Sequence, residues 1–234
     1  MLRFPGNGHI DVQPSLTLMP TLVDLSRPIE TGMPVYPTYP NVQVIEWTIF
    51  ETHGYKSEVL FASTHTGTHV DAPVRFVEGG LDVSSIPVET FVVDAVAVDV
   101  SGSKLIGGEE LRRKIEGLFE KGFGVLLYTS WEDLYGTERY ILENPGLSAD
   151  GAKVLVELGA SIVGIDSPSI DPAGASGFPA HRALLSSRIP VIENLCNLRQ
   201  LVGKKFKLMA LPLKIKGATA SPIRAVAVLE EAKT

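Results

Sequence analysis

The chain of 234 residues is 44% hydrophobic and 21% charged, which is the composition of a soluble globular protein that can bury a sizeable core. A net charge of -6 at pH 7 predicts no general attraction to nucleic acid or to an anionic membrane surface. The single cysteine, Cys196, excludes a disulfide framework, and no stretch approaches the ~18 apolar residues of a membrane helix. The start of the sequence has no signal-peptide pattern, so we expect a cytoplasmic protein.

Residues 1–20 mix glycine, proline and polar residues, and we expect them to form an N-terminal arm. A short strand is predicted over 22–26, and a proline-rich loop over 28–40 follows it. Tyr36 and Tyr39 lie on this loop, where they can either line a pocket or pack the loop against the body. No linker, repeat or low-complexity tract follows, so residues 21–234 are predicted to form one domain.

Residues 63–73 read Ser-Thr-His-Thr-Gly-Thr-His-Val-Asp-Ala-Pro and hold two of the five histidines. β-branched runs at 42–50 and 59–63 precede them and predict neighbouring antiparallel strands around a turn at 53–55. In an extended segment, side chains alternate, so His65, His69 and Asp71 would share one face with Gly67 between the imidazoles. Two imidazoles and one carboxylate suit a first-row divalent metal, although a solvated strand face is the plainer alternative.

Strand and helix patterns alternate through the middle of the chain. Apolar runs at 92–100, 124–129 and 161–166 predict buried strands, and amphipathic stretches at 109–121 and 148–159 predict the helices between them. This alternation predicts an α/β fold with a parallel or mixed sheet that carries helices. The carboxyl ends of such strands commonly line active sites, so Trp131, just after the second run, is a candidate substrate contact.

Two further residues of the metal-binding type follow. His181 begins a predicted helix at 181–186, and Glu193 lies within an apolar strand predicted at 190–195. A carboxylate is costly to bury unless it is paired or bound to a metal. The plainer alternatives are a solvent-facing position for Glu193 and a helix-capping role for His181. The last two strands are predicted at 204–213 and 223–229.

Together these motifs resemble the cyclase family of metal-dependent hydrolases, which includes bacterial kynurenine formamidase and isatin hydrolase. The resemblance runs from about residue 22 to the end of the chain. It implies a mixed, β-barrel-like sheet flanked by helices in a single swivelling β/α domain. It also implies a homo-oligomer, often a homodimer, in which the N-terminal arm would exchange between subunits. The motifs that carry it are His-Thr-Gly-Thr-His-Val-Asp-Ala-Pro at 65–73, Asp-Leu-Ser-Arg-Pro at 24–28, Gly-Ile-Asp-Ser-Pro-Ser at 164–169, and His181 followed by Ile-Glu-Asn-Leu at 192–195.

The resemblance also implies the site and its chemistry. One or two zinc or manganese ions would be bound, with Asp71 and Glu193 as bridging carboxylates if there are two. The family's aromatic substrate contact falls on Tyr36. The implied activity is hydrolysis of the carbon–nitrogen bond of a small amide, formamide or cyclic imide by metal-activated water, as in arylformamidases. The family's metal ligands fall on His65, His69, Asp71, His181 and Glu193.

Arg75 departs from the family pattern. The formamidases have a proton-shuttling histidine four residues after the motif aspartate, whereas arginine cannot exchange a proton at neutral pH. Arg75 would instead hold a substrate carboxylate or stabilise an oxyanion, which leaves Glu193 as the candidate for moving the proton. Two alternatives therefore stay open: a lactone hydrolase or cyclase, and a catalytically silent member that binds a metal or a carboxylate ligand.

Overall fold

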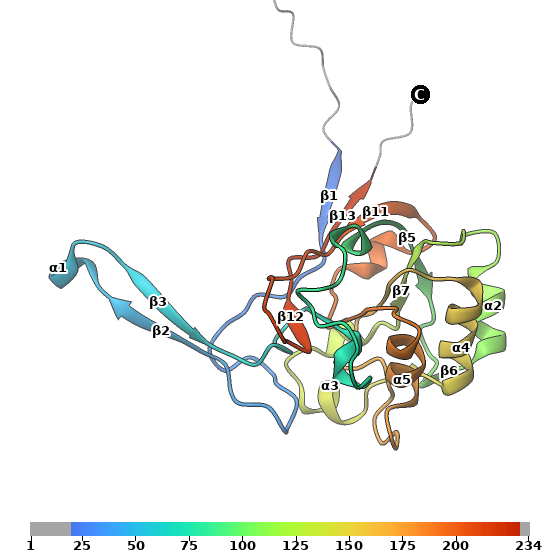
Figure 1. Cartoon of the computed structure of the whole chain (residues 1–234), viewed down its shortest axis with the longest axis horizontal. Helices are drawn as coiled ribbons and strands as arrows, with labels where there is room; N and C mark the ends of the chain where they lie inside the picture. The colour runs from blue at the N-terminus through green and yellow to red at the C-terminus, as the bar shows by residue number, and fades with distance from the viewer. Residues whose placement is uncertain (1–19, 230–234) are drawn as a thin grey trace, which may run out of the picture.

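Within residues 20–229, which the computed structural model describes, nine strands form one mixed sheet (Figure 1). The predicted N-terminal arm falls on residues that lie, except for Pro20, outside this range. The order across the sheet is β1-β13-β11-β5-β7-β9-β10-β4-β12. The bounds of the strands are β1 Thr21–Asp24, β4 His69–Asp71, β5 Val92–Asp99, β7 Gly124–Tyr128, β9 Val163–Ile165, β10 Val191–Glu193, β11 Lys205–Met209, β12 Ala220–Pro222 and β13 Val226–Leu229.

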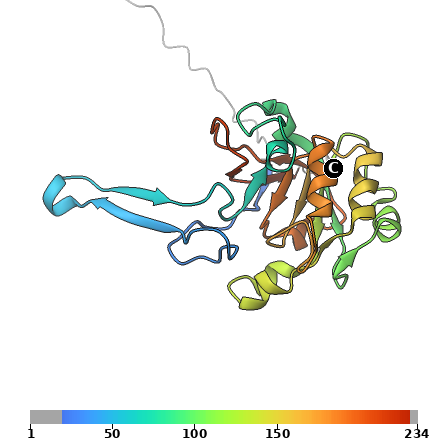
Figure 2. The ribbon, with the colours of Figure 1, turned by 60° about the horizontal axis from the view of Figure 1, so that its bottom comes forward.

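The centre of the sheet is parallel and buried on both faces, which explains its continuous apolar runs. Strands β5, β7, β9 and β10 run parallel, while β11 and β4 pair antiparallel at either side of them. Alternate residues of β5 enter different cores: Val96 and Val98 pack on the helical side, and Ala95 and Ala97 pack on the other. The α/β fold with a mixed, curled sheet is therefore confirmed (Figure 2).

Three helices cover one face of this sheet: α2 Gly108–Ile115, α4 Ala149–Leu158 and α5 Pro179–Ser186 (Figure 1). Helix α4 has the predicted limits, because the Ser148 hydroxyl accepts a hydrogen bond from the Gly151 amide and Gly159 ends the helix in a left-handed conformation. Helix α2 is shorter than predicted. Glu116 leaves the helical region and Gly117 has a φ of 76°, although the following apolar residues still pack on the core.

A two-stranded hairpin projects from the body of the molecule (Figures 1 and 2). It consists of β2 Gln43–Thr48 and β3 Ser57–Phe61, which pair antiparallel as predicted, with α1 Phe50–His53 at its tip. The expected turn at 53–55 is thus preceded by one helical turn, which Gly54 ends at a φ of 75°. Apolar side chains of the hairpin are exposed on both of its faces, including Trp47 at 70% and Phe50 at 60%.

Shorter elements connect these parts. Strands β6 Leu105–Ile106 and β8 Gly146–Leu147 form a small parallel pair, and α3 Glu138–Leu142 lies near the pocket described below. Single turns of 3-10 helix occur at η1 Pro73–Arg75, η2 Val88–Phe91, η3 Trp131–Leu134 and η4 Leu198–Leu201. No helix among the described residues has the length and apolar character needed to cross a membrane.

Two sequence expectations at the sheet edge are wrong. The segment 63–73 was expected to be extended throughout, but only His69–Asp71 forms strand β4, and residues 64–68 turn. Gly67 adopts a φ of 59°, which glycine tolerates more readily than other residues. No strand was predicted between those at 204–213 and 223–229, but Ala220–Pro222 forms β12, which pairs with β4.

Candidate metal centre

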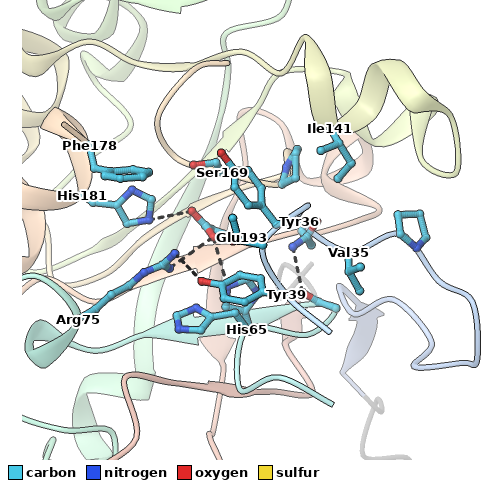
Figure 3. Close-up of a pocket in the computed structure, with 16 residues that line it drawn as sticks. Val35, Tyr36, Tyr39, His65, Arg75, Ile141, Ser169, Phe178, His181 and Glu193 are labelled. Carbon is cyan, nitrogen blue, oxygen red and sulfur yellow. Dashed lines mark hydrogen bonds and ion pairs between the residues drawn. The ribbon is translucent and has the colours of Figure 1, made fainter. Parts of the chain in front are cut away.

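Five predicted ligand residues converge beside strands β4 and β10. The two strands are antiparallel neighbours, and their register sets His69 opposite Glu193 and Asp71 opposite Val191. His65 reaches the same point from the turn before β4, and His181 reaches it from the first turn of α5. Figure 3 shows His181 directed toward Glu193. His65 Nδ1 lies 2.8 Å from Asp71 Oδ1, so the turn at 64–68 brings His65 to the site that an extended strand was expected to form.

The ligand-type atoms form two overlapping sets, each with its atoms within 4.8 Å of one another. We call His65, His69 and Asp71 the first triad, and Asp71, His181 and Glu193 the second triad. Asp71 belongs to both. His69 Nε2 lies 3.2 Å from Glu193 Oε2, and His181 Nε2 lies 3.0 Å from Glu193 Oε1, so the triads are contiguous.

Each imidazole is held by its outward nitrogen, which leaves the other nitrogen directed into the site. His69 Nδ1 donates to the Gly67 carbonyl oxygen at 2.9 Å, and His181 Nδ1 donates to Asp171 Oδ2 at 2.6 Å. His65 Nε2 lies 2.9 Å from the Thr219 hydroxyl. The inward atoms are therefore His65 Nδ1, His69 Nε2 and His181 Nε2.

These inward atoms are buried and lack hydrogen-bond partners within the described residues. His65 Nδ1 lies 2.8 Å from Asp71 Oδ1, but the two atoms are not aligned as a hydrogen bond, and both remain without a partner. His69 Nε2 and His181 Nε2 are also unpartnered. Leaving four such atoms together is costly unless something binds them. Nitrogen and carboxylate donors around one point fit a divalent first-row metal.

The two carboxylates of the site are ionised despite their burial. Burial alone would raise the pKa of Asp71, but the Arg75 guanidinium and the nearby imidazoles hold it well below its ordinary value. Burial likewise opposes ionisation of Glu193, yet the neighbouring His181 lowers its pKa. In the opposite direction, burial would lower the pKa of His69, but Glu193 and Asp71 raise it. Two ionised carboxylates thus face the imidazoles, which favours a bound cation.

Arg75 lies at the boundary between the ligand atoms and the open pocket. Its Nη1 is paired with Asp71 Oδ2 and lies 4.0 Å from Glu193 Oε2. Its Nη2 donates to the Tyr39 hydroxyl at 3.2 Å, and the Tyr39 ring stacks on His65 with the ring centroids 5.3 Å apart (Figure 3). Tyr39 thus joins the site, although its sequence position did not distinguish it from a loop-packing residue.

A pocket of about 650 Å³, including space open to solvent, adjoins the ligand atoms. Tyr36, on which the family's aromatic substrate contact falls, is among the residues that line it, and so are Tyr39, Ile141 and Phe178 (Figure 3). Trp131 departs from the expectation: it is not among the residues that line this pocket, and its indole N–H donates to the Tyr140 carbonyl oxygen at 2.9 Å. The sequence correctly predicted the strand that ends shortly before Trp131, but it did not determine which way the Trp131 side chain points.

Sequence reasoning also missed the residues that support the ligands. Asp171 accepts hydrogen bonds from the backbone amides of Ala180 and His181 as well as from the His181 ring. Thr219, which supports His65, is 154 residues away from it along the chain. Neither residue has a local pattern that would identify it, because each role depends on a long-range contact.

Comparison with known proteins places this site in context. Residues 23–172 match the sequence profile of the family described as "Putative cyclase". Kynurenine formamidase of Salinibacter ruber is 34% identical over 214 residues, covering 88% of this chain and 96% of that protein. Kynurenine formamidase of Bacillus cereus is 34% identical over 206 residues, covering 87% of this chain and 95% of that protein.

Solved structures show the same fold. Isatin hydrolase A from Labrenzia aggregata, bound to benzyl benzoate, superposes with a TM-score of 0.83 and 26% identity, covering 91% of this chain and 94% of that chain. A structure described as a potential metal-dependent hydrolase with cyclase activity gives a TM-score of 0.76 and 28% identity, covering 91% of this chain and all of that one at 100%.

Proposed function

The chain belongs to the cyclase family and is a metal-dependent hydrolase of carbon–nitrogen bonds outside peptides, and we propose that its substrate is a small formamide, amide or cyclic imide with an aromatic ring. The observation that carries the proposal is the convergence of four unpartnered buried ligand atoms beside an aromatic-lined pocket. The names of the relatives support cleavage of a carbon–nitrogen bond. Tyr36, Tyr39 and Phe178 line the pocket, which supports a substrate with an aromatic ring.

The residues that would hold zinc or manganese are those of the two triads. A divalent ion bound there supplies Lewis acidity, which polarises a carbonyl group and makes a water acidic near neutral pH. The unpartnered nitrogens and the ionised carboxylates suit either metal. We propose zinc or manganese, in one or two ions per subunit, for this position.

Side chains at and around the ligands would transfer the proton, stabilise charge and position the substrate. We assign the proton transfer to Glu193. Its carboxylate would take the proton released when water adds to the carbonyl carbon and would return it to the departing nitrogen. Its ionised state, held by His181, allows it to accept that proton. Arg75 stays protonated and would stabilise negative charge on the carbonyl oxygen, while Tyr36 and Tyr39 would position the aromatic part of the substrate.

Lactone hydrolysis, cyclase activity and a silent binding role are less well supported. The same ligand set could open a lactone, but the names of the relatives favour cleavage of a carbon–nitrogen bond. A silent member that binds a metal would keep the same oriented histidines, but the relatives are named as enzymes that hydrolyse their substrates. Arg75 alone therefore does not argue for lost catalysis.

The test joins metal content to turnover. The purified protein is analysed for metal, and hydrolysis of N-formyl aromatic amines, cyclic imides and lactones is measured with zinc or manganese restored. We expect turnover of a formamide or imide that is lost in His65→Ala, whereas the hairpin variant His53→Ala keeps it. Bound metal without turnover of any compound in the panel would favour the silent alternative, and turnover of lactones alone would favour the lactonase.

We also propose that the protein is a homodimer in the cytoplasm, with a small molecule as substrate and no nucleic acid or membrane partner. The projecting hairpin supports the dimer, because its two strands expose Trp47, Leu60 and other large apolar side chains to solvent. The net charge of -6 supports the absence of nucleic acid and anionic membrane as partners. Light scattering on the purified protein tests the subunit number directly.

A further inference from the structure

We propose that the Arg75 guanidinium takes the place of a second metal ion, so that each subunit binds one divalent ion, in the first triad. This inference rests on the metal site of the proposed function and specifies how many ions that site holds. In this arrangement, His65, His69 and Asp71 bind the ion. The carboxylates of the second triad face the Arg75 guanidinium in place of a second ion.

The two triads differ in how many of their atoms remain free. In the first triad, His65 Nδ1, His69 Nε2 and Asp71 Oδ1 are all buried and unpartnered within the described residues. Three converging donor atoms with no protein partner are the arrangement that a metal ion requires, and water or substrate can complete the coordination.

The second triad has most of its donors already engaged. Asp71 Oδ2 is paired with Arg75 Nη1, and Glu193 Oε1 accepts a hydrogen bond from the Ile170 amide at 2.8 Å. Among the fully buried atoms of this set in the described residues, His181 Nε2 is the one without a partner. An ion placed here would have to displace the guanidinium from Asp71.

Charge also favours one ion. Arg75 carries a permanent positive charge, and its Nη1 faces both Asp71 and Glu193, the two carboxylates that a second ion would use. An ion in the second triad would lie within a few ångströms of this guanidinium. Two positive charges at such a separation repel each other, and a divalent ion is repelled more strongly than a monovalent one.

The guanidinium is built into its position. Arg75 lies in the turn η1, four residues after Asp71, where backbone hydrogen bonds fix the start of the side chain. The guanidinium donates to the Tyr39 hydroxyl and lies 5.4 Å from the centre of the Phe76 ring, within the range of a cation–π contact. Its side chain is only 17% exposed, unlike a mobile surface arginine.

The experiment counts ions. The intact protein is stripped with a chelator, dialysed against excess Mn²⁺ or Zn²⁺, and analysed for metal per subunit. We expect one ion in the wild type and in Arg75→Lys, which keeps a positive charge, and two ions in Arg75→Ala. Arg182→Ala is the matched control: this guanidinium also lies over Phe76, at 5.3 Å, but belongs to neither triad, so one ion is expected.

A spectroscopic measurement on the wild type makes the test independent of any variant's folding. With Mn²⁺ in excess, we expect the electron paramagnetic resonance spectrum of an isolated ion. A spin-coupled pair, or two ions per wild-type subunit, would overturn the inference while leaving the hydrolase intact. One ion in a folded Arg75→Ala protein would overturn it too. A wild type that binds no ion would instead remove the metal site on which the proposed function rests.

Discussion

The metal centre and the hairpin both contain groups that the described chain leaves without partners, but their chemistry is opposite. At the metal centre, the unpartnered groups are polar and buried, including His69 Nε2 and Asp71 Oδ1. On the hairpin they are apolar and exposed, including Trp47 and Phe50. Buried polar atoms lose water and need a hydrogen bond or an ion, whereas exposed apolar atoms gain by leaving water.

The difference indicates what each region lacks. In the first triad, two nitrogens and a carboxylate oxygen can be satisfied by a single small cation, and His181 Nε2 lies in the adjoining second triad. Two strands that expose apolar side chains on both faces can be covered only by a surface of comparable size, such as a second copy of the chain. Isolated two-stranded hairpins are at best marginally stable in water, so such a partner would also stabilise the projecting structure.

Removing a ligand from the first triad tests the metal side of the comparison most severely. In His69→Ala we expect metal affinity to fall by more than ~100-fold and hydrolysis to fall with it, because even the loss of a supporting hydrogen bond costs 10–100-fold. Competition with a metal indicator gives the affinity. His53→Ala, which removes a histidine from the hairpin tip, should bind metal normally. Unchanged affinity in His69→Ala would contradict the assignment of the first triad.

Placing a charge on the hairpin tests the apolar side. In Trp47→Glu we expect the dimer to weaken by at least ~2 kcal/mol, about 30-fold in its dissociation constant, since buried tryptophans are common interaction hot spots. Sedimentation over a range of concentrations measures this shift. Leu105→Glu adds the same charge at an exposed leucine on the body and should leave the dimer unchanged. Equal behaviour of the two variants would exclude the hairpin as the interface.

The hydroxyl behind His65 offers a smaller and more specific change. Thr219→Val keeps the size of the side chain but removes the contact to His65 Nε2, and we expect metal affinity to fall by about 10-fold. Asp171→Asn alters the support of His181, which belongs to the second triad. If the ion lies in the first triad, calorimetric titration should show the larger loss in Thr219→Val. The reverse order would place the ion near His181.

Sequence patterns predicted the fold well where burial is regular. The apolar run at 124–129 became β7, and the Ser148 cap began α4, because both depend on neighbouring residues and on a period that the sequence displays. His65, His69 and Asp71 were predicted as metal-binding residues from their types and spacing, whereas His181 and Glu193 followed from the resemblance to the cyclase family. The structure brings all five together. The strand, the helix and the first three residues needed only the local sequence.

The remainder depended on contacts between distant segments. The turn at 64–68 looked like a strand because its alternation was regular, and only the left-handed Gly67 reveals the bend. Asp171 and Thr219 support ligands across gaps of 10 and 154 residues, and no periodic pattern encodes such pairs. Trp131 followed a correctly predicted strand, but its indole points to the Tyr140 carbonyl and not into the pocket.

Asp166 extends the comparison to a buried carboxylate that has hydrogen bonds but no cation. Its oxygens accept from the amide of Thr129 at 3.0 and 3.2 Å. Burial nevertheless raises its pKa to about 6 from an ordinary value of 3.8, in contrast to Asp71 beside Arg75. The folded state therefore holds the proton more tightly than the unfolded state, so this group lowers stability as the pH rises from about 4 to 6.

Asp166→Asn removes this titration and so gives the smallest predicted effect. Relative to the wild type, the free energy of unfolding of the variant should rise by about 1 kcal/mol between pH 5 and pH 8, because one pKa unit corresponds to 1.36 kcal/mol and part of the shift has already acted at pH 5. Any fixed cost of rearranged hydrogen bonds to Thr129 is the same at both pH values and cancels in this difference. Urea unfolding in the presence of a chelator measures it without interference from metal binding. A difference that stays constant with pH would show that the hydrogen bonds from Thr129 offset the effect of burial on the pKa of Asp166.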